Sequence, residues 1–244
     1  VMPSDVRYVV PTHVHLDHAG AAGRLLREMP NAQVVAHELS VPHLVDPTKL
    51  IASATRVFGE ETMALYGTPE PIPSGRVTAT GEESTLDLGG GTMATLVHAP
   101  GHAPHQIAVS LDDTGALLTA DAVGIVYPSL NTLIPTTPPP AFNPAELVAT
   151  VNTLRQGEPK ELLVPHFGTR KDVDWVFDQT VEKVQAWVEK VRSLVKGGIG
   201  VDEISALMEK EVIAEASVTE LPTYGKVSVR TSVKGIVHYL SKNP

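Results

Sequence analysis

The stretch "THVHLDHAG" at residues 12–20 constrains the fold of this chain more than any other part of the sequence. Within six positions it holds three histidines and one aspartate, namely His13, His15, Asp17 and His18. An apolar run at residues 8–10 precedes it and predicts a short buried strand. Polar side chains beside a buried strand cost free energy unless each finds a partner. The cluster therefore predicts a strand that ends in a site built from these side chains.

The spacing of the four residues suits metal coordination. Alternate residues of an extended segment point to one face, so His13 and His15 can bind one ion. Asp17 and His18 follow where the chain turns into a helix, and they can face a second point close by. Imidazole suits zinc, iron and similar ions, and a carboxylate adds a harder oxygen ligand. The pattern H-x-H-x-D-H can therefore serve two adjacent metal ions from one loop.

One loop cannot complete two coordination shells, so partners are expected at the ends of other predicted strands. Three ligand-type residues follow such strands, at 92–97, 116–119 and 161–164: His102, Asp121 and His166. His105 shares the turn of His102 and is a candidate to support a ligand. A lone histidine is more often a surface or core residue, so no role is assigned to His37, His43, His98 and His238.

Apolar periodicity and turn residues predict the remaining elements. Helices are expected at 17–29, 47–66 with a break near Gly59, 144–156 with Asn143 as N-cap, and about 173–195, 202–213 and 229–240. Strands are expected at 7–10 and 33–36, and hairpins at 85–97 and 107–119. The segment "IPTTPPPAFNP" at 134–144 predicts an ordered loop or lid, because its prolines lack the N–H that regular structure needs.

The bulk composition narrows the classes of partner. The chain has 244 residues, a net charge of −9 and no cysteine. An acidic protein repels phosphate backbones, so nucleic acid is not expected as a partner. Without thiolates, a metal site must use nitrogen and oxygen ligands. No apolar run is long enough to span a bilayer and no signal peptide is evident, so we expect no membrane partner and a cytoplasmic location. A homodimer is the base-rate expectation for assembly.

Together, "THVHLDH" (12–18), "PGH" (100–102), "AD" (120–121) and "PHFG" (165–168) resemble the metallo-β-lactamase superfamily. The resemblance covers about residues 6–170 and fills all seven ligand positions of the family. It implies one metal ion held by His13, His15 and His102. It implies a second ion held by Asp17, His18 and His166, with Asp121 bridging the two. Two divalent ions are therefore expected as cofactors, zinc first, with iron, manganese or cobalt as alternatives.

The resemblance also implies an α/β (α+β) fold, an αββα sandwich of two mixed sheets with helices outside. We expect a metallo-β-lactamase-like domain at residues 1–170 and a C-terminal helical extension at 171–244 that packs on it. Family members usually place several strands before the ligand loop, whereas twelve residues precede it here. We therefore expect the first N-terminal strands of the family fold to be missing from these 244 residues.

Metal-assisted hydrolysis is the first reaction expected of such a site. A hydroxide bridging two cations attacks an electrophilic carbon, and the cations stabilise the developing oxyanion. Asp17 is the best-placed carboxylate to orient the nucleophile and move its proton, which makes it the expected catalytic residue. The complete ligand set resembles that of glyoxalase II-type thioesterases and lactonases. The expected substrate is thus a small thioester, lactone or ester. Tyr127 is a candidate to donate a hydrogen bond to it, and the alternative is that Tyr127 packs in its loop.

Three other functions stay open. The ligand set also resembles that of phosphodiesterases, which would use the same two ions. Some relatives bind a single iron at the three-histidine site and oxidise persulfides, which would make His13, His15 and His102 the site of an oxidoreductase. A scaffold without catalysis is disfavoured, because decayed members of the superfamily usually lose ligands.

Overall fold

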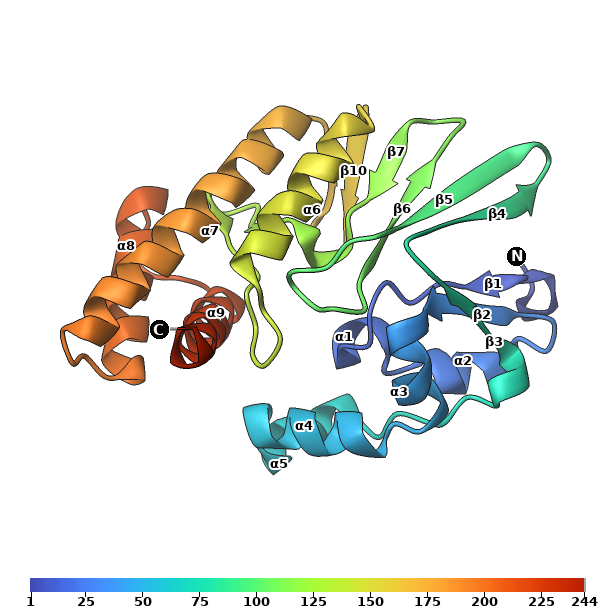
Figure 1. The fold of residues 1–244 in the computed structure, drawn as a ribbon, viewed down its shortest axis with the longest axis horizontal. Coiled ribbons are helices and arrows are strands. Elements are labelled where there is room, and N and C mark those ends of the chain that lie inside the picture. Colours follow the sequence, from blue (N-terminus) through green and yellow to red (C-terminus); the bar gives the residue numbers. More distant parts are fainter. Residues whose placement is uncertain (244) are drawn as a thin grey trace.

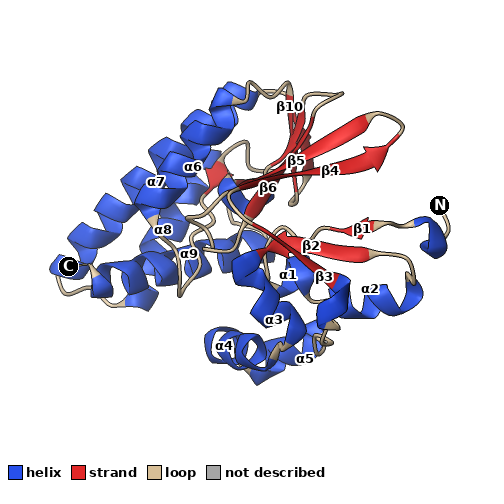
Figure 2. Cartoon of the chain, turned by 45° about the vertical axis from the view of Figure 1, so that its right-hand side comes forward, coloured by secondary structure: helices blue, strands red, loops and turns tan. Residues whose placement is uncertain are grey.

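Two β-sheets pack face to face, with helices on both outer sides (Figure 1). The computed structural model describes residues 1–243, apart from the side chains of Thr62 and Tyr66. Figure 2 shows the two sheets as neighbouring layers between two groups of helices. This is the expected αββα arrangement with C-terminal helices. No helix within residues 1–243 is both long and apolar enough to cross a bilayer.

The first sheet is parallel, with the order β1-β2-β3. Its strands are β1 (Tyr8–Val9), β2 (Gln33–His37) and β3 (Val77–Thr80). The helices of this half are α1 (Leu16–Ala19), α2 (Ala22–Glu28), α3 (Val41–Val45), α4 (Thr48–Phe58) and α5 (Glu60–Tyr66). Leu26, Val34 and Leu44 belong to a buried cluster that joins this sheet to α2 and α3. Burial of such side chains stabilises each by roughly 1.5–3 kcal/mol, so this contact holds the outer layer in place.

The second sheet is mixed, with the order β11-β10-β7-β6-β5-β4. Its strands are β4 (Glu83–Gly89), β5 (Thr92–His98), β6 (Ile107–Leu111), β7 (Ala116–Leu118), β10 (Glu161–Val164) and β11 (Gly168–Arg170). Val35 of the first sheet packs in one buried cluster with Leu96 and Ile107 of the second. This cluster is the core between the sheets.

The C-terminal helices form the layer beyond the second sheet, and the last two of them pack on one another and on the helix before them (Figure 2). They are α6 (Pro144–Gln156), α7 (Val173–Lys196), α8 (Val201–Ala216) and α9 (Thr223–Lys242). A two-stranded sheet of β8 (Ile125–Val126) and β9 (Leu133–Ile134) lies within the same core. That core contains Val151 and Leu162 from before residue 170, and Val176 and Val233 from after it. The segments before and after residue 170 therefore share one core. The division into two regions at that residue stays a prediction.

Most expected elements are confirmed, among them α6 with Asn143 accepting bonds from the N–H groups of Ala145 and Glu146. The single helix predicted at 17–29 is wrong in its start and in its continuity. It begins at Leu16 and divides into α1 and α2 at Gly20–Ala21, since glycine is a poor helix former. Several short elements were not predicted: α3, β3, β8, β9 and β11. These are five residues or fewer, too short to give a clear period.

Candidate metal centre

The strand order of the second sheet brings three distant residues to one edge. Strand β6 is antiparallel to both β5 and β7, and β10 is parallel to β7. Strands β5, β7 and β10 therefore run in the same direction, and their carboxyl ends share an edge. His102, Asp121 and His166 follow these three ends.

The loop after β1 reaches the same edge from the first sheet. The Ile107 N–H at the start of β6 donates to the Thr12 carbonyl at 2.8 Å, which ties this loop to the second sheet. His15 is the extended N-cap residue of α1, and Asp17 and His18 lie in that short helix. All seven residues predicted as ligands are thus brought together, although their binding of metal stays a prediction.

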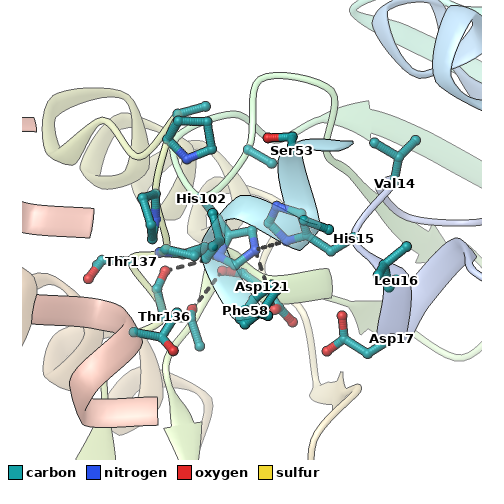
Figure 3. Close-up of a pocket in the computed structure, with 18 of the residues that line it drawn as sticks. Val14, His15, Leu16, Asp17, Ser53, Phe58, His102, Asp121, Thr136 and Thr137 are labelled. Carbon is teal, nitrogen blue, oxygen red and sulfur yellow. Dashed lines mark hydrogen bonds and ion pairs between the residues drawn. The ribbon is translucent and has the colours of Figure 1, made fainter. Parts of the chain in front are cut away.

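One group of ring nitrogens belongs to His13, His15 and His102. His15 Nδ1 is 3.0 Å from His13 Nε2 and 3.0 Å from His102 Nε2. Figure 3 shows His15 and His102 facing each other beside Asp121. These separations are close to the roughly 3.3 Å between two ligand atoms of a tetrahedral zinc ion with bonds of about 2.0 Å.

A second group contains Asp17, His18 and His166, and a third joins Asp121 to His13 and His18, one residue from each of the other two groups. Asp121 Oδ2 is 3.5 Å from His102 Nε2 and 3.5 Å from His18 Nε2, while its Oδ1 is 3.6 Å from His166 Nε2. Asp17 Oδ2 is 3.6 Å from His18 Nε2. One carboxylate therefore faces both groups, as the bridging role expected for Asp121 requires.

Electrostatics favours neutral imidazoles in the three-histidine group, whereas the interaction with the Asp121 carboxylate raises the pKa of His166. Burial lowers the pKa of His13, His15 and His102, and neighbouring histidines add to this effect at His13 and His15. Burial opposes the ionisation of Asp121, but the nearby rings of His102, His166 and His18 outweigh it and hold the pKa of this carboxyl well below its usual value. Neutral imidazoles have a free lone pair each, which is the form that binds metal.

The donor set fits a bound cation. His15 Nδ1 has at most one hydrogen to donate, so it cannot satisfy both nitrogens that lie 3.0 Å away. His18 Nε2 is buried and has no hydrogen-bond partner. A buried polar atom without a partner costs about 1–3 kcal/mol. Divalent cations shared by these atoms would satisfy both, and the His/Asp cluster therefore fits a metal site.

Backbone and hydroxyl partners orient the outer nitrogens of two of these rings. His102 Nδ1 donates to the Thr136 carbonyl at 3.0 Å, which leaves Nε2 as the acceptor that faces the cluster. His13 Nδ1 is 3.2 Å from Thr12 Oγ1. The turn that carries His102 also depends on Gly101, whose φ is +118°. A Cβ at Gly101 would lie 2.3 Å from the Leu147 backbone, so only glycine lets this turn rest on α6.

A cavity of about 400 Å³ opens beside the cluster. His15, Asp17, His102, Asp121 and His166 are among the residues that line it. Its walls are mainly apolar, and most of them come from α4, the proline-rich loop and α9, with further residues from the loop after β1 and the turn of His102. The segment expected to be an ordered loop or lid at 134–144 has no regular structure from residue 135 to 143, and its prolines at 138–140 border the cavity.

Tyr127 does not occupy the place expected of a substrate contact. Its side chain is 3% exposed and belongs to the core that the second sheet shares with the C-terminal helices. Its hydroxyl is 2.7 Å from Ser228 Oγ. Ser228 lines the cavity, so Tyr127 reaches the cavity only through this residue. Its position therefore gives the expected substrate contact no support.

Sequence reasoning missed the walls of the cavity. Leu50, Val57 and Phe58 of α4 line the cavity. Their helical spacing is visible in the sequence, but the same spacing is typical of a helix face that packs in the core. Tyr224 and Val227 of α9 lie before the helix start expected at residue 229. His105, left open by the sequence, also lines the cavity, and its Nδ1 is buried without a partner.

Two known proteins show how far the similarity in sequence extends. The metallo-beta-lactamase fold-containing protein ST1585 of Sulfurisphaera tokodaii is 33% identical over 135 residues, which cover 54% of this chain and 49% of that protein. N-acyl homoserine lactonase AttM of Azorhizobium caulinodans is 32% identical over 123 residues, which cover 49% of this chain and 42% of that protein. These matches span about half the length of the curated relatives.

Solved structures share the fold over almost the whole chain. The archaeal metallo-beta-lactamase superfamily protein ST1585 from Sulfolobus tokodaii aligns with a TM-score of 0.69 at 23% identity, covering 95% of this chain and 80% of that one. The metallo-beta-lactamase family protein TTHA1429 from Thermus thermophilus aligns with a TM-score of 0.67 at 20% identity, covering 99% and 76%. The family model of the metallo-beta-lactamase superfamily matches residues 1–166, the region that holds all seven predicted ligands. With this match and the strand-end geometry, the chain belongs to the metallo-beta-lactamase superfamily.

Proposed function

We propose that this protein is a metal-dependent hydrolase of a small acyl substrate, namely a lactone, ester or thioester. The observation that carries the proposal is the convergence of two three-residue groups on Asp121 in the lining of a mainly apolar cavity. Proteins with this fold are generally hydrolytic enzymes. The curated relatives include proteins named N-acyl homoserine lactonases, which supports an acyl substrate.

Two divalent ions, when bound, supply Lewis acidity and lower the pKa of water enough for hydrolysis near neutral pH. His13, His15 and His102 would hold one ion, and Asp17, His18 and His166 the other, with Asp121 between them. Asp17 is the more exposed of the two carboxylates: 38% of its side chain is accessible, against 7% for Asp121. Both residues line the cavity. Asp17 is therefore placed to orient the attacking water and to take up its proton.

The cavity supports a substrate with an apolar arm. Leu50 and Val57 on α4 and Val227 on α9 line the same cavity as the ligand cluster. Such walls bind an acyl chain through burial of its methylenes, at about 0.8 kcal/mol each. The reacting carbonyl would then lie in the same cavity, next to the two groups of ligands.

Metal analysis of the purified protein and a hydrolysis panel test the proposal. The panel contains lactones, carboxylic esters and thioesters with short and medium acyl chains, each assayed with and without a chelator. We expect activity on at least one class, its loss with chelator, and its return when zinc, manganese or iron is added back. Full activity in a metal-free sample, or no activity on any class with two ions bound, contradicts the proposal.

The same experiment separates the alternatives. One bound iron together with oxygen uptake on a persulfide would identify an oxidoreductase that uses the group of His13, His15 and His102. Cleavage of phosphodiesters in place of acyl compounds would keep the metal centre and change the substrate class. Both outcomes replace the proposed acyl hydrolysis.

A further inference from the structure

Helix α9 lies outside the residues that match the family model, yet it contacts the segment beside the ligands. Ser232 Oγ donates to the Pro135 carbonyl at 2.6 Å and accepts from the Thr137 N–H at 3.3 Å. Thr137 Oγ1 donates to the Ser232 carbonyl at 3.0 Å. Both side chains are buried. Three hydrogen bonds thus fix residues 135–137 to one turn of α9.

Helix α9 approaches this segment so closely at Gly235 that no side chain fits between the two backbones. A Cβ at Gly235 would lie 1.8 Å from the Thr137 carbonyl oxygen and 2.7 Å from the Pro138 carbonyl carbon. Ser232 and Gly235 are one turn apart on the same face. The missing side chain at Gly235 therefore lets the hydrogen bonds of Ser232 form.

The residue between the two anchored positions touches the candidate metal centre on two sides. The Thr136 carbonyl accepts the hydrogen bond from His102 Nδ1. Thr136 Oγ1 is 3.1 Å from the Asp121 carbonyl and 3.2 Å from the Val123 carbonyl. Pro135 and Thr137 on either side of it are held by Ser232. The orientation of this carbonyl therefore depends on α9.

We infer that Ser232 is a positioning residue of the metal centre, which acts through the Thr136 carbonyl to fix the orientation and tautomer of His102. The C-terminal helices then serve the site directly as well as cover the second sheet. The inference rests on the metal centre of the proposed function. Partners that orient a ligating histidine in this way typically change metal affinity by 10–100-fold when they are lost.

Metal-binding measurements on variants test the inference without any substrate. Ser232→Ala removes the hydroxyl at nearly constant volume. Thr137→Val removes the bond to the Ser232 carbonyl at constant shape, and Thr137→Ser restores the hydroxyl. Ser241→Ala is the control for loss of a hydroxyl on the same helix, because the exposed Ser241 donates within the helix, to the His238 carbonyl. Zinc affinity is measured by competition with a chromophoric chelator, and the ligand geometry by the visible spectrum of the cobalt-loaded protein.

We expect the wild-type protein to bind two equivalents of zinc. Ser232→Ala and Thr137→Val should weaken one of the two by about tenfold or more and change the cobalt spectrum. Thr137→Ser and Ser241→Ala should match the wild type in both measurements. Wild-type affinity for both equivalents in folded Ser232→Ala overturns the inference, as does an equal loss in Ser241→Ala.

Two safeguards keep the result interpretable. If Ser232→Ala does not fold, the Thr137 pair decides, and equal affinities in Thr137→Val and Thr137→Ser overturn the inference. If the pattern holds but no acyl compound is cleaved, the proposed hydrolysis fails and the positioning role stands. If hydrolysis occurs while all variants bind zinc like the wild type, the positioning role alone fails.

Discussion

Asp121 and His166 meet across two parallel strands, with Asp121 Oδ1 3.6 Å from His166 Nε2. They follow β7 and β10, which are neighbours in the second sheet, and this pairing joins Asp121 to the second ligand group. The other oxygen of Asp121 faces His102 and His18. The geometry of the site thus follows from strand order, and changes to the turns at the strand ends should disturb it.

Gly101→Ala tests the turn that carries His102. The new Cβ would contact the Leu147 backbone and also strain the positive φ, so we expect a loss of unfolding free energy of roughly 2 kcal/mol or more, with weaker zinc binding. Gly91→Ala is the control, because Gly91 has a φ of +87° and no atom near its Cβ. Denaturant unfolding measures both variants. Equal losses would show that strain alone, without the contact to α6, accounts for the effect.

Asn143→Ala tests the cap that supports the same turn. The Asn143 side chain accepts hydrogen bonds from two N–H groups at the start of α6. The backbone N–H of Asn143 donates to the Gly101 carbonyl at 2.8 Å. Loss of the cap should lower the unfolding free energy by about 1 kcal/mol, and Asn143→Asp should keep most of it, because aspartate caps equally well. Chemical denaturation of the three proteins checks this. An Asn143→Asp variant as unstable as Asn143→Ala would exclude capping as the cause.

The pH dependence of stability should reveal His105. Burial, with added repulsion from His43 and other histidines, lowers the pKa of His105 to about 3. The unfolded chain takes up this proton near pH 6.5 while the folded protein does not, so stability decreases as the pH falls below 6.5. One such group contributes a slope of at most about 1.4 kcal/mol per pH unit.

His105→Gln should therefore flatten this slope in the chelator-treated protein between pH 6.5 and 5. Other histidines with lowered pKa values, among them His37, keep part of the slope in the variant. Unfolding in guanidinium chloride at several pH values measures the difference. Identical slopes in the wild type and the variant would rule out a neutral, buried His105 in the folded protein.

Val227→Trp tests the apolar wall contributed by α9. Val227 is 50% exposed and lines the cavity, so a larger ring should occupy space for the acyl arm without disturbing a core. Each methylene excluded from the wall should cost about 0.8 kcal/mol, which is about a fourfold loss in kcat/KM. The preference for medium over short acyl chains should fall, while Leu88→Trp on the distant β4 should leave it unchanged. A uniform loss for all chain lengths would contradict an acyl arm at this wall.

Much of the site could be predicted because its ligands are side chains at strand ends. An apolar run followed by histidine or aspartate is visible at His13, His102, Asp121 and His166, and the sheet only had to bring these ends together. The support from Thr136 could not be predicted, because it uses a backbone carbonyl that any residue supplies. Ser232 likewise gives no sequence signal, since its partners depend on how α9 packs. Short strands such as β3 were not predicted, because four residues are too few to show an alternation of apolar and polar side chains.

Metal content tests the proposed two-ion centre most directly. We predict two equivalents of divalent metal in the wild-type protein and a loss of at least one of them in Asp121→Asn, which keeps the shape of the side chain and removes the charge that faces both groups. Acyl hydrolysis should fall with the lost metal, and circular dichroism should report an unchanged fold. Two equivalents bound by Asp121→Asn with wild-type affinity, or no metal bound by the wild-type protein, would contradict the account.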